Sequence, residues 1–147
     1  MAPRKLSLRR SLQIRHVDAG SCNGCESELA ALTNPVYDVQ RYGVDLVASP
    51  RHADVLTVSG PVTRQMAPAL QRTYGAMGEP RLVVAVGDCA AGHCPFRGSY
   101  AAGTGVAAVL PVADHIPGCP PAPEDIIRHL RALMARGHPG RSAEEGV

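Results

Sequence analysis

The chain has 147 residues, a length that is typical of one domain with its own hydrophobic core. Hydrophobic residues make up 45% of it, which excludes overall disorder, and no apolar run approaches the roughly 20 residues of a transmembrane helix. The formal net charge of +2 is too small to indicate a nucleic-acid-binding protein.

The start of the chain is basic, and we expect residues 1–10 to form an arm that is flexible or docks on a partner. Arg9 and Arg10 form a twin-arginine pair, but no apolar stretch follows them as it would in an export signal. We therefore expect a cytoplasmic protein. Because cytoplasmic thiols stay reduced, its five cysteines favour metal binding or catalysis over a disulfide framework.

Residues 11–136 are expected to form the folded domain, followed by a loose polar tail at 137–147. Short apolar or alternating runs predict strands at 11–17, 44–48, 54–59, 81–86 and 106–112. Helical patterns run from residue 22 to the Asn34-Pro35 pair, over 63–77 and over 125–135. Pro68 lies inside the second pattern and predicts a kink or a later start of that helix.

Strands that alternate with helices predict an α/β domain with a mostly parallel sheet. Ligands of such sheets bind beyond the carboxyl ends of the strands. Cys22, Cys89 and Cys119 each follow a predicted strand. We therefore expect these three thiols to meet at one edge of the sheet, although they are far apart in sequence.

Four thiolates suit either a zinc ion or an iron–sulfur cluster. Zinc sites commonly use two C-x2-C pairs, whereas this chain has one pair, Cys22 and Cys25, and two distant single cysteines, Cys89 and Cys119. A cubane cluster offers four iron corners that separate loops can reach. The spacing therefore favours the cluster. The fifth cysteine, Cys94, is either a free thiol, a redox-sensitive neighbour or an alternative to Cys89, which is favoured by its place at a strand end.

The motifs CNGCE, GDCA and PGCPP, in this order, resemble one family over 11–134. It is the family of small [4Fe–4S] subunits shared by respiratory complex I (its 20-kDa, B-type subunit) and membrane-bound group 4 [NiFe] hydrogenases of the formate hydrogenlyase and energy-converting type. The resemblance implies a flavodoxin-like, three-layer fold that holds one [4Fe–4S] cluster. The ligands that it implies are Cys22, Cys25, Cys89 and Cys119.

The resemblance also implies a role in electron transfer. In complex I the first two ligands are adjacent, but here Asn23 and Gly24 separate them, as in the hydrogenase branch. We therefore expect an electron relay to or from the active site of a large subunit in a membrane-associated [NiFe] hydrogenase-like complex. The alternative is the B-type subunit of a complex I-like NADH/quinone oxidoreductase. A nickel–iron site takes two C-x2-C pairs, so this chain is not expected to be catalytic alone.

The family's partners would be a large catalytic subunit, a ferredoxin-like iron–sulfur subunit and membrane subunits, with this chain peripheral on the cytoplasmic face. Glu28 is either a proton-path residue or a helix-start acid, and Glu26 is expected to be only a helix-start acid. His115 is either a neighbour that tunes the cluster or a plain surface histidine. Ala113 and His93 depart from the family's usual pattern.

A rival interpretation is a small zinc-binding or thiol-redox module. Cys22 and Cys25 lie near a predicted helix start, where a dithiol pair is commonly reactive. This interpretation gives the PGCPP motif no role, so we consider it the weaker one.

Overall fold

The computed structural model describes residues 11–136. Its strands form one five-stranded sheet: β1 (Leu12–Asp18), β2 (Val44–Leu46), β3 (Val55–Ser59), β4 (Leu82–Val86) and β5 (Asp114–Ile116). The strand order is β2-β1-β3-β4-β5, and every neighbouring pair is parallel. This is the order of flavodoxin-like sheets, so the predicted fold class is confirmed.

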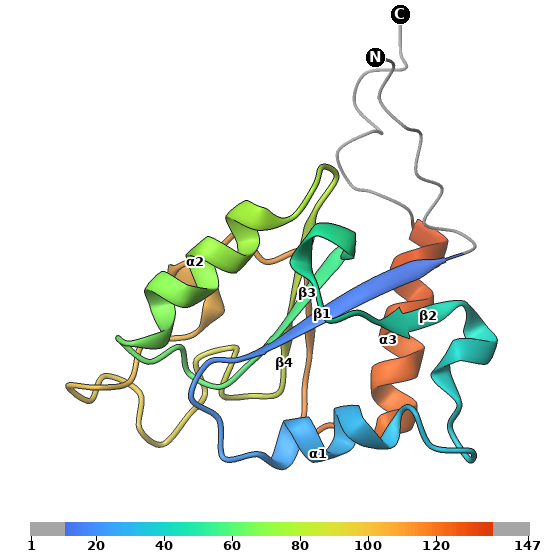
Figure 1. Ribbon diagram of the computed structural model, residues 1–147. Coiled ribbons are helices and arrows are strands. Elements are labelled where there is room, and N and C mark those ends of the chain that lie inside the picture. The colour runs from blue at the N-terminus through green and yellow to red at the C-terminus, as the bar shows by residue number, and fades with distance from the viewer. Residues whose placement is uncertain (1–10, 137–147) are drawn as a thin grey trace, which may run out of the picture.

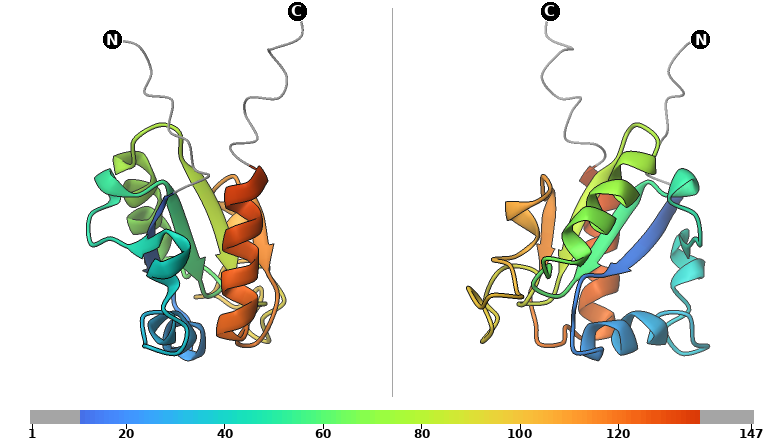
Figure 2. Two further views of the ribbon diagram at one scale, coloured as in Figure 1. Left: turned by 90° about the vertical axis from the view of Figure 1, so that its right-hand side faces the viewer. Right: turned by 60° about the vertical axis from the view of Figure 1, so that its left-hand side comes forward.

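Helices cover both faces of the sheet, which gives three layers (Figure 1). Helix α2 (Met66–Ala76) packs on one face, and α1 (Gly24–Ala31) and α3 (Pro123–Arg136) lie on the other side. Figure 2 shows the same separation of α2 from α3 in two further views. The core is therefore divided into two apolar clusters, one on each face.

Strand β4 has an uninterrupted apolar sequence because both of its faces are covered. Leu82, Val84 and Val86 pack in the cluster with α1 and α3, whereas Val83 and Ala85 pack in the cluster with α2. Side chains alternate between the faces of a strand, so a strand that is covered on both sides is apolar at every position.

The strand predicted at 106–112 is wrong. Val106–Ala108 form a short 3-10 helix there, and the edge strand beside β4 is β5. Val106 and Leu110 are buried on the α2 side, so the apolar run reflects burial and not a strand. The β5 sequence DHI carries little apolar signal. Cys119 still follows a strand, as expected.

Helix α2 begins at Met66, which bears out a start later than residue 63. Pro68 falls in its first turn, where its missing N–H leaves no hydrogen bond of the helix unmade. Within residues 11–136, no helix combines the length and apolar character that crossing a membrane requires. The arm at 1–10 and the tail at 137–147 lie outside the described residues.

Candidate metal centre

A cavity of about 80 Å³ lies at the carboxyl edge of the sheet. The four cysteines named as ligands from the sequence, Cys22, Cys25, Cys89 and Cys119, all line it. Cys94 is not among the lining residues. The structure thus brings together thiols that come from three separate loops, as the predicted parallel sheet requires.

Two of these loops are joined by hydrogen bonds from backbone amides. The Asp88 amide donates to the Gly118 carbonyl at 2.9 Å, and the Gly118 amide donates to the Asp88 carboxylate at 3.0 Å. The Gly87 amide donates to the Ile116 carbonyl at 2.8 Å, which extends the pairing of β4 with β5. These contacts fix Cys89 and Cys119 relative to each other.

The loop that carries the cysteine pair is shaped by Asp18 at the end of β1. Its carboxylate accepts from the amides of Gly20 at 2.9 Å and Ser21 at 2.8 Å. Asn23 then adopts a left-handed conformation with φ 72° and precedes α1. The turn therefore presents Cys22 before the helix and Cys25 in its first turn.

Glycine is required where the loops meet the thiols. Gly87 has φ +85°, and a Cβ at this position would lie 2.7 Å from the Cys25 sulfur. A side chain there would collide with the Cys25 sulfur, so this thiol can keep its position only beside a glycine. Four soft thiol donors around an open space fit an iron–sulfur cluster, in which each iron takes one cysteine.

No group of three or more His, Cys, Asp or Glu side chains in the described part of the chain is placed to hold a single metal ion. The cysteines surround a space and do not converge on one point. Cys22 and Cys119 are exposed, whereas Cys25 and Cys89 are half-buried. The cavity is thus open to the surface on one side.

Burial keeps two of the thiols protonated in the free chain. Burial, followed by the charge of Glu26 and by the other three cysteines of the cavity, raises the pKa of Cys25 to about 12. Burial and a hydrogen bond with Cys94 raise the pKa of Cys89 to about 11. Metal ligation needs thiolates, so binding would release these protons and become stronger as the pH rises.

A partly buried polar network lies beside the cavity and centres on Glu26. The Glu26 carboxylate accepts hydrogen bonds from the hydroxyls of Ser21 and Ser59, and it contacts His16 Nε2 at 3.3 Å. His16 Nδ1 lies 3.2 Å from the Thr57 hydroxyl. A carboxylate only accepts, so the proton of the neutral ring is on Nε2.

The contacts within the network and its burial shift the pKa values of His16 and Glu26. Burial lowers the pKa of His16 although Glu26 opposes the shift, so the contact is a hydrogen bond of a neutral ring more than an ion pair. Burial by itself would raise the pKa of Glu26, but the hydrogen bonds from Ser21, Ser59 and His16 outweigh it and lower the pKa. Glu26 is therefore a carboxylate at neutral pH.

Sequence reasoning missed this role of Glu26, which was expected to be only a helix-start acid. The available signal was the polar residues Thr57 and Ser59 in the otherwise apolar strand β3 and His16 in the alternating strand β1. Their common face and their distance from Glu26 follow from strand register, which the sequence alone does not fix.

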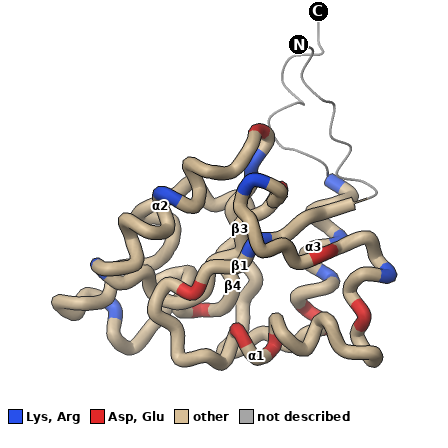
Figure 3. The backbone as a smooth tube through the Cα atoms, viewed as in Figure 1, with Lys and Arg blue, Asp and Glu red and all other residues tan. Residues whose placement is uncertain are grey.

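Two other predicted residues lie beside the site but not on the cavity. His115 Nε2 is 3.1 Å from the Gly87 carbonyl, so the ring donates to the loop backbone next to Cys89. Glu28 is half-buried in α1 and does not line the cavity. Figure 3 shows the acidic positions of α1 at this edge of the sheet. A proton path through Glu28 stays a prediction.

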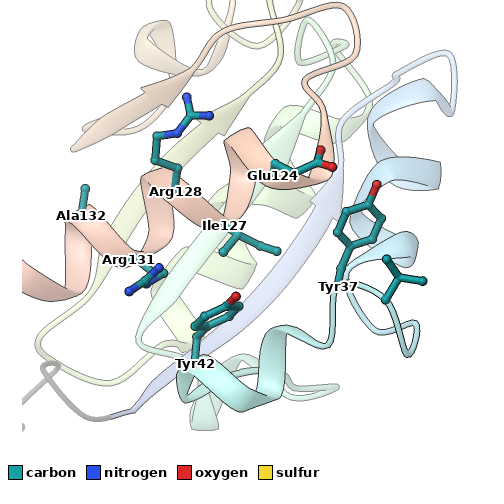
Figure 4. Close-up of a pocket in the computed structure, with 8 residues that line it drawn as sticks. Tyr37, Tyr42, Glu124, Ile127, Arg128, Arg131 and Ala132 are labelled. Atoms are coloured by element: carbon teal, nitrogen blue, oxygen red, sulfur yellow. The ribbon is translucent and has the colours of Figure 1, made fainter.

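A cavity larger than the one between the cysteines lies elsewhere in the described part of the chain. A groove of about 580 Å³ lies between α3 and the segment at 36–42, on the side of the sheet that α3 covers (Figure 4). Tyr42 and Arg131 face each other in it, with the guanidinium carbon 4.8 Å from the ring centre. None of its lining residues is a cysteine, so size does not identify the metal centre in this chain.

Comparison with known proteins identifies relatives in two kinds of enzyme complex. The chain is 44% identical over 118 residues to the probable membrane-bound hydrogenase subunit mbhJ of Pyrococcus furiosus, covering 80% of this chain and 71% of the relative. It is 49% identical over 119 residues to the B-type subunit of the NADH-quinone oxidoreductase of Bacteroides fragilis, covering 80% and 60%. It is 39% identical over 116 residues to formate hydrogenlyase subunit 7 of Escherichia coli, covering 79% of this chain and 46% of that relative.

Solved structures agree with the fold. A chain of the membrane-bound sulfane sulfur reductase, an archaeal respiratory membrane complex, superposes with a TM-score of 0.75 at 30% identity, covering 86% of this chain and 70% of the other. A chain of the NAD+-reducing [NiFe]-hydrogenase superposes with a TM-score of 0.66 at 19% identity, covering 88% and 94%, which shows the fold alone.

The family model of the NADH ubiquinone oxidoreductase 20 Kd subunit matches residues 22–133, from the first cysteine of the cavity to the core of α3. This range spans the cavity and most of the sheet. The chain therefore belongs to the NADH ubiquinone oxidoreductase 20 Kd subunit family.

Proposed function

We propose that this chain is an electron-transfer subunit that holds one [4Fe–4S] cluster through Cys22, Cys25, Cys89 and Cys119. The observation that supports it most directly is the meeting of these four thiols around one small cavity. A bound [4Fe–4S] cluster supplies one-electron redox chemistry. The protein's own contribution is to fix the thiols and to limit the access of water.

The exposure of the site supports a role as a relay between subunits. Cys22 and Cys119 are exposed, so in the isolated chain one side of the cluster would be accessible to solvent. A partner that covers this edge would shield it from water and would bring its own redox centre close. We therefore propose that the partner on this edge is the large catalytic subunit of an oxidoreductase complex, with a ferredoxin-like subunit as the other electron partner.

The C-x2-C spacing of Cys22 and Cys25 favours a hydrogenase-like complex, as the resemblance to that branch implies. The similarity to the hydrogenase subunit of P. furiosus and to formate hydrogenlyase subunit 7 supports this proposal. The 49% identity to the B-type subunit of an NADH-quinone oxidoreductase supports the second candidate, a complex I-like quinone reductase. In either complex we propose that the chain is peripheral on the cytoplasmic face of the membrane.

Anaerobic affinity purification of this chain from its own cells, with metal analysis of the co-purifying proteins, separates the two candidates. Nickel in a co-purifying large subunit, together with iron in this chain, is the result expected for a hydrogenase. Iron with a large subunit that lacks nickel would favour the quinone reductase or a complex with another substrate. Zinc in this chain in place of iron would contradict both.

A further inference from the structure

One face of the sheet changes from apolar to polar at the cavity. On β1, Leu12 and Ile14 belong to the core on the α3 side, and His16 follows them on the same face. On β3, Val55 belongs to this core, and Thr57 and Ser59 follow it. Thr57 and Ser59 are fully buried. Buried polar groups are costly unless they have partners, so this patch needs an acceptor.

Glu26 supplies that acceptor. It takes hydrogen bonds from Ser59 of β3, from His16 of β1 and from Ser21 of the loop that leads to Cys22. One carboxylate thus connects the first turn of α1 to two strands and to the loop before the helix. An acid that acted only on the helix dipole would need none of these contacts.

The network ends at the wall of the cavity. Ser21 lines the cavity, and Gly60, which follows Ser59, lines it as well. Glu26 itself directly follows Cys25. The hydroxyl of Ser21 also accepts from the Asn23 amide at 3.1 Å, so the turn between the two cysteines is connected to the same group.

We propose that Glu26 is a positioning residue for the cysteine pair, which holds Cys22 and Cys25 toward Cys89 and Cys119 and places a fixed negative charge beside the metal centre. This inference rests on the proposed function, in which the four thiols bind a cluster. Partners beyond the ligands commonly orient ligands and tune the bound metal. Here that residue is Glu26, which lies in α1 beside the ligand Cys25. Hydrogen bonds with His16 and Ser59 connect Glu26 to the sheet.

The test compares Glu26→Ala and Glu26→Gln with the unchanged chain. Glu79→Gln is the matched control, because it removes one carboxylate from an exposed position before β4, at the opposite edge of the sheet. Alkylation of the cysteines in the metal-free chain is followed by mass spectrometry under anaerobic conditions. We expect faster alkylation of Cys22 and Cys25 in Glu26→Ala than in Glu26→Gln, which has lost the same charge, with Cys94 unchanged as an internal reference.

After anaerobic reconstitution, Glu26→Ala should bind iron roughly 10- to 100-fold more weakly than the unchanged chain, the usual loss when such a partner is removed. Glu26→Gln keeps hydrogen-bonding capacity but no charge, so it should retain most of the iron and shift the reduction potential to a more positive value. A purely structural role of Glu26 would not move the potential of the glutamine variant. Glu79→Gln should leave alkylation, iron content and potential unchanged.

Unchanged alkylation and iron affinity in Glu26→Ala would overturn the inference, as would an unchanged potential in Glu26→Gln. If Cys94 also reacts faster in Glu26→Ala, that variant has unfolded and the glutamine variant decides. If the unchanged chain takes up no iron at all, the proposed function fails. The alkylation rates of Cys22 and Cys25, compared between the two Glu26 variants, would still test whether Glu26 positions the cysteine pair.

Discussion

Gly87 lies where β4 ends and the cysteine loops meet, and its backbone approaches both Cys25 and the loop of Cys119. The Cβ of any other residue would lie 2.7 Å from the Cys25 sulfur and 3.4 Å from the Gly118 carbonyl oxygen. Gly98 has a similar left-handed φ of +77°, but a Cβ there would meet nothing within 4 Å. Substitution of Gly98 would thus cost only backbone strain, whereas substitution of Gly87 would cost the same strain and a steric clash.

We expect Gly87→Ala to lower the iron content after reconstitution, because the added methyl group would displace the Cys25 sulfur. Gly98→Ala shares only the conformational cost, on the order of 1–2 kcal/mol, and should keep full iron content. Iron analysis and thermal unfolding of both variants measure the two effects. Full iron content in Gly87→Ala would contradict the fit of the cavity to a cluster.

Asp54 offers a prediction about pH that is independent of the metal centre. It precedes β3 and accepts from the Gln13 amide at 3.0 Å. Burial raises its pKa above the ordinary value of 3.8, and this hydrogen bond opposes the shift only in part. As the pH rises from 3.8 through the raised pKa, the unfolded chain holds fewer protons than the folded chain, so this group lowers stability over that window.

Asp54→Asn keeps an acceptor for the Gln13 amide but has no charge. We expect its free energy of unfolding, relative to the unchanged chain, to increase across that window and then to level off. Urea unfolding of the metal-free proteins at several pH values measures the difference, and Glu79→Gln controls for the loss of an exposed carboxylate. A difference that does not change with pH would show that burial of Asp54 is not costly.

For single residues, the meeting of the cysteines at one edge of the sheet was predictable from the sequence, whereas the hydrogen bonds of Glu26 were not. Cys22, Cys89 and Cys119 each follow a strand, and parallel strands end at one edge, so local pattern is sufficient to bring them together. The partners of Glu26 depend on strand register, since His16 lies opposite Thr57 only because β1 and β3 pair at that offset. Register is a property of the folded sheet.

At the scale of elements, apolar pattern predicted the buried central strands and α3, but it failed at the edge of the sheet. The run at 106–112 is apolar because it is covered by the α2 side of the core, and Pro111 lacks the N–H that a central strand would need. β5 has the polar sequence DHI, and Asp114 bonds to Arg136 of α3 at 3.0 Å. With only three residues, two of them polar, β5 lacks the alternation of apolar and polar residues that predicts a strand.

Helix α3 is expected to stabilise the domain through its buried face. Leu130 is 1% exposed and packs in the core with the sheet. Leu130→Ala should therefore lower the free energy of unfolding by about 2–5 kcal/mol. Arg128→Ala removes only an exposed pair with Asp125 and should cost less than about 1 kcal/mol. Equal losses in chemical denaturation would contradict the assignment of the core face.

For the whole molecule, the exposed apolar residues indicate which surface is available to the partner that we propose. Phe96 and Tyr100 are 70% and 84% exposed in the loop that follows Cys89 and Cys94. Val36 is comparably exposed, at 76%, but it lines the groove along α3. The first two adjoin the edge that we propose is covered by the large catalytic partner.

We expect a Phe96→Ser and Tyr100→Ser double variant to reconstitute its iron normally but to lose most of the co-purifying large subunit. Val36→Ser should retain the large subunit, because that residue is not at the cysteine edge. Quantitative mass spectrometry of anaerobic pull-downs measures the amount of large subunit per copy of this chain. Normal recovery of the large subunit with the double variant would place its interface elsewhere.

The central claim is that four particular cysteines hold one [4Fe–4S] cluster, and single Cys→Ser variants test it most directly. Iron and acid-labile sulfide would be measured per chain after anaerobic reconstitution, with a paramagnetic signal on reduction. We predict about four of each in the unchanged chain and in Cys94→Ser, and loss of the native signal in the variants of Cys22, Cys25, Cys89 and Cys119. Zinc or no metal in the unchanged chain, or loss of the cluster with Cys94 but not with Cys89, would contradict the account.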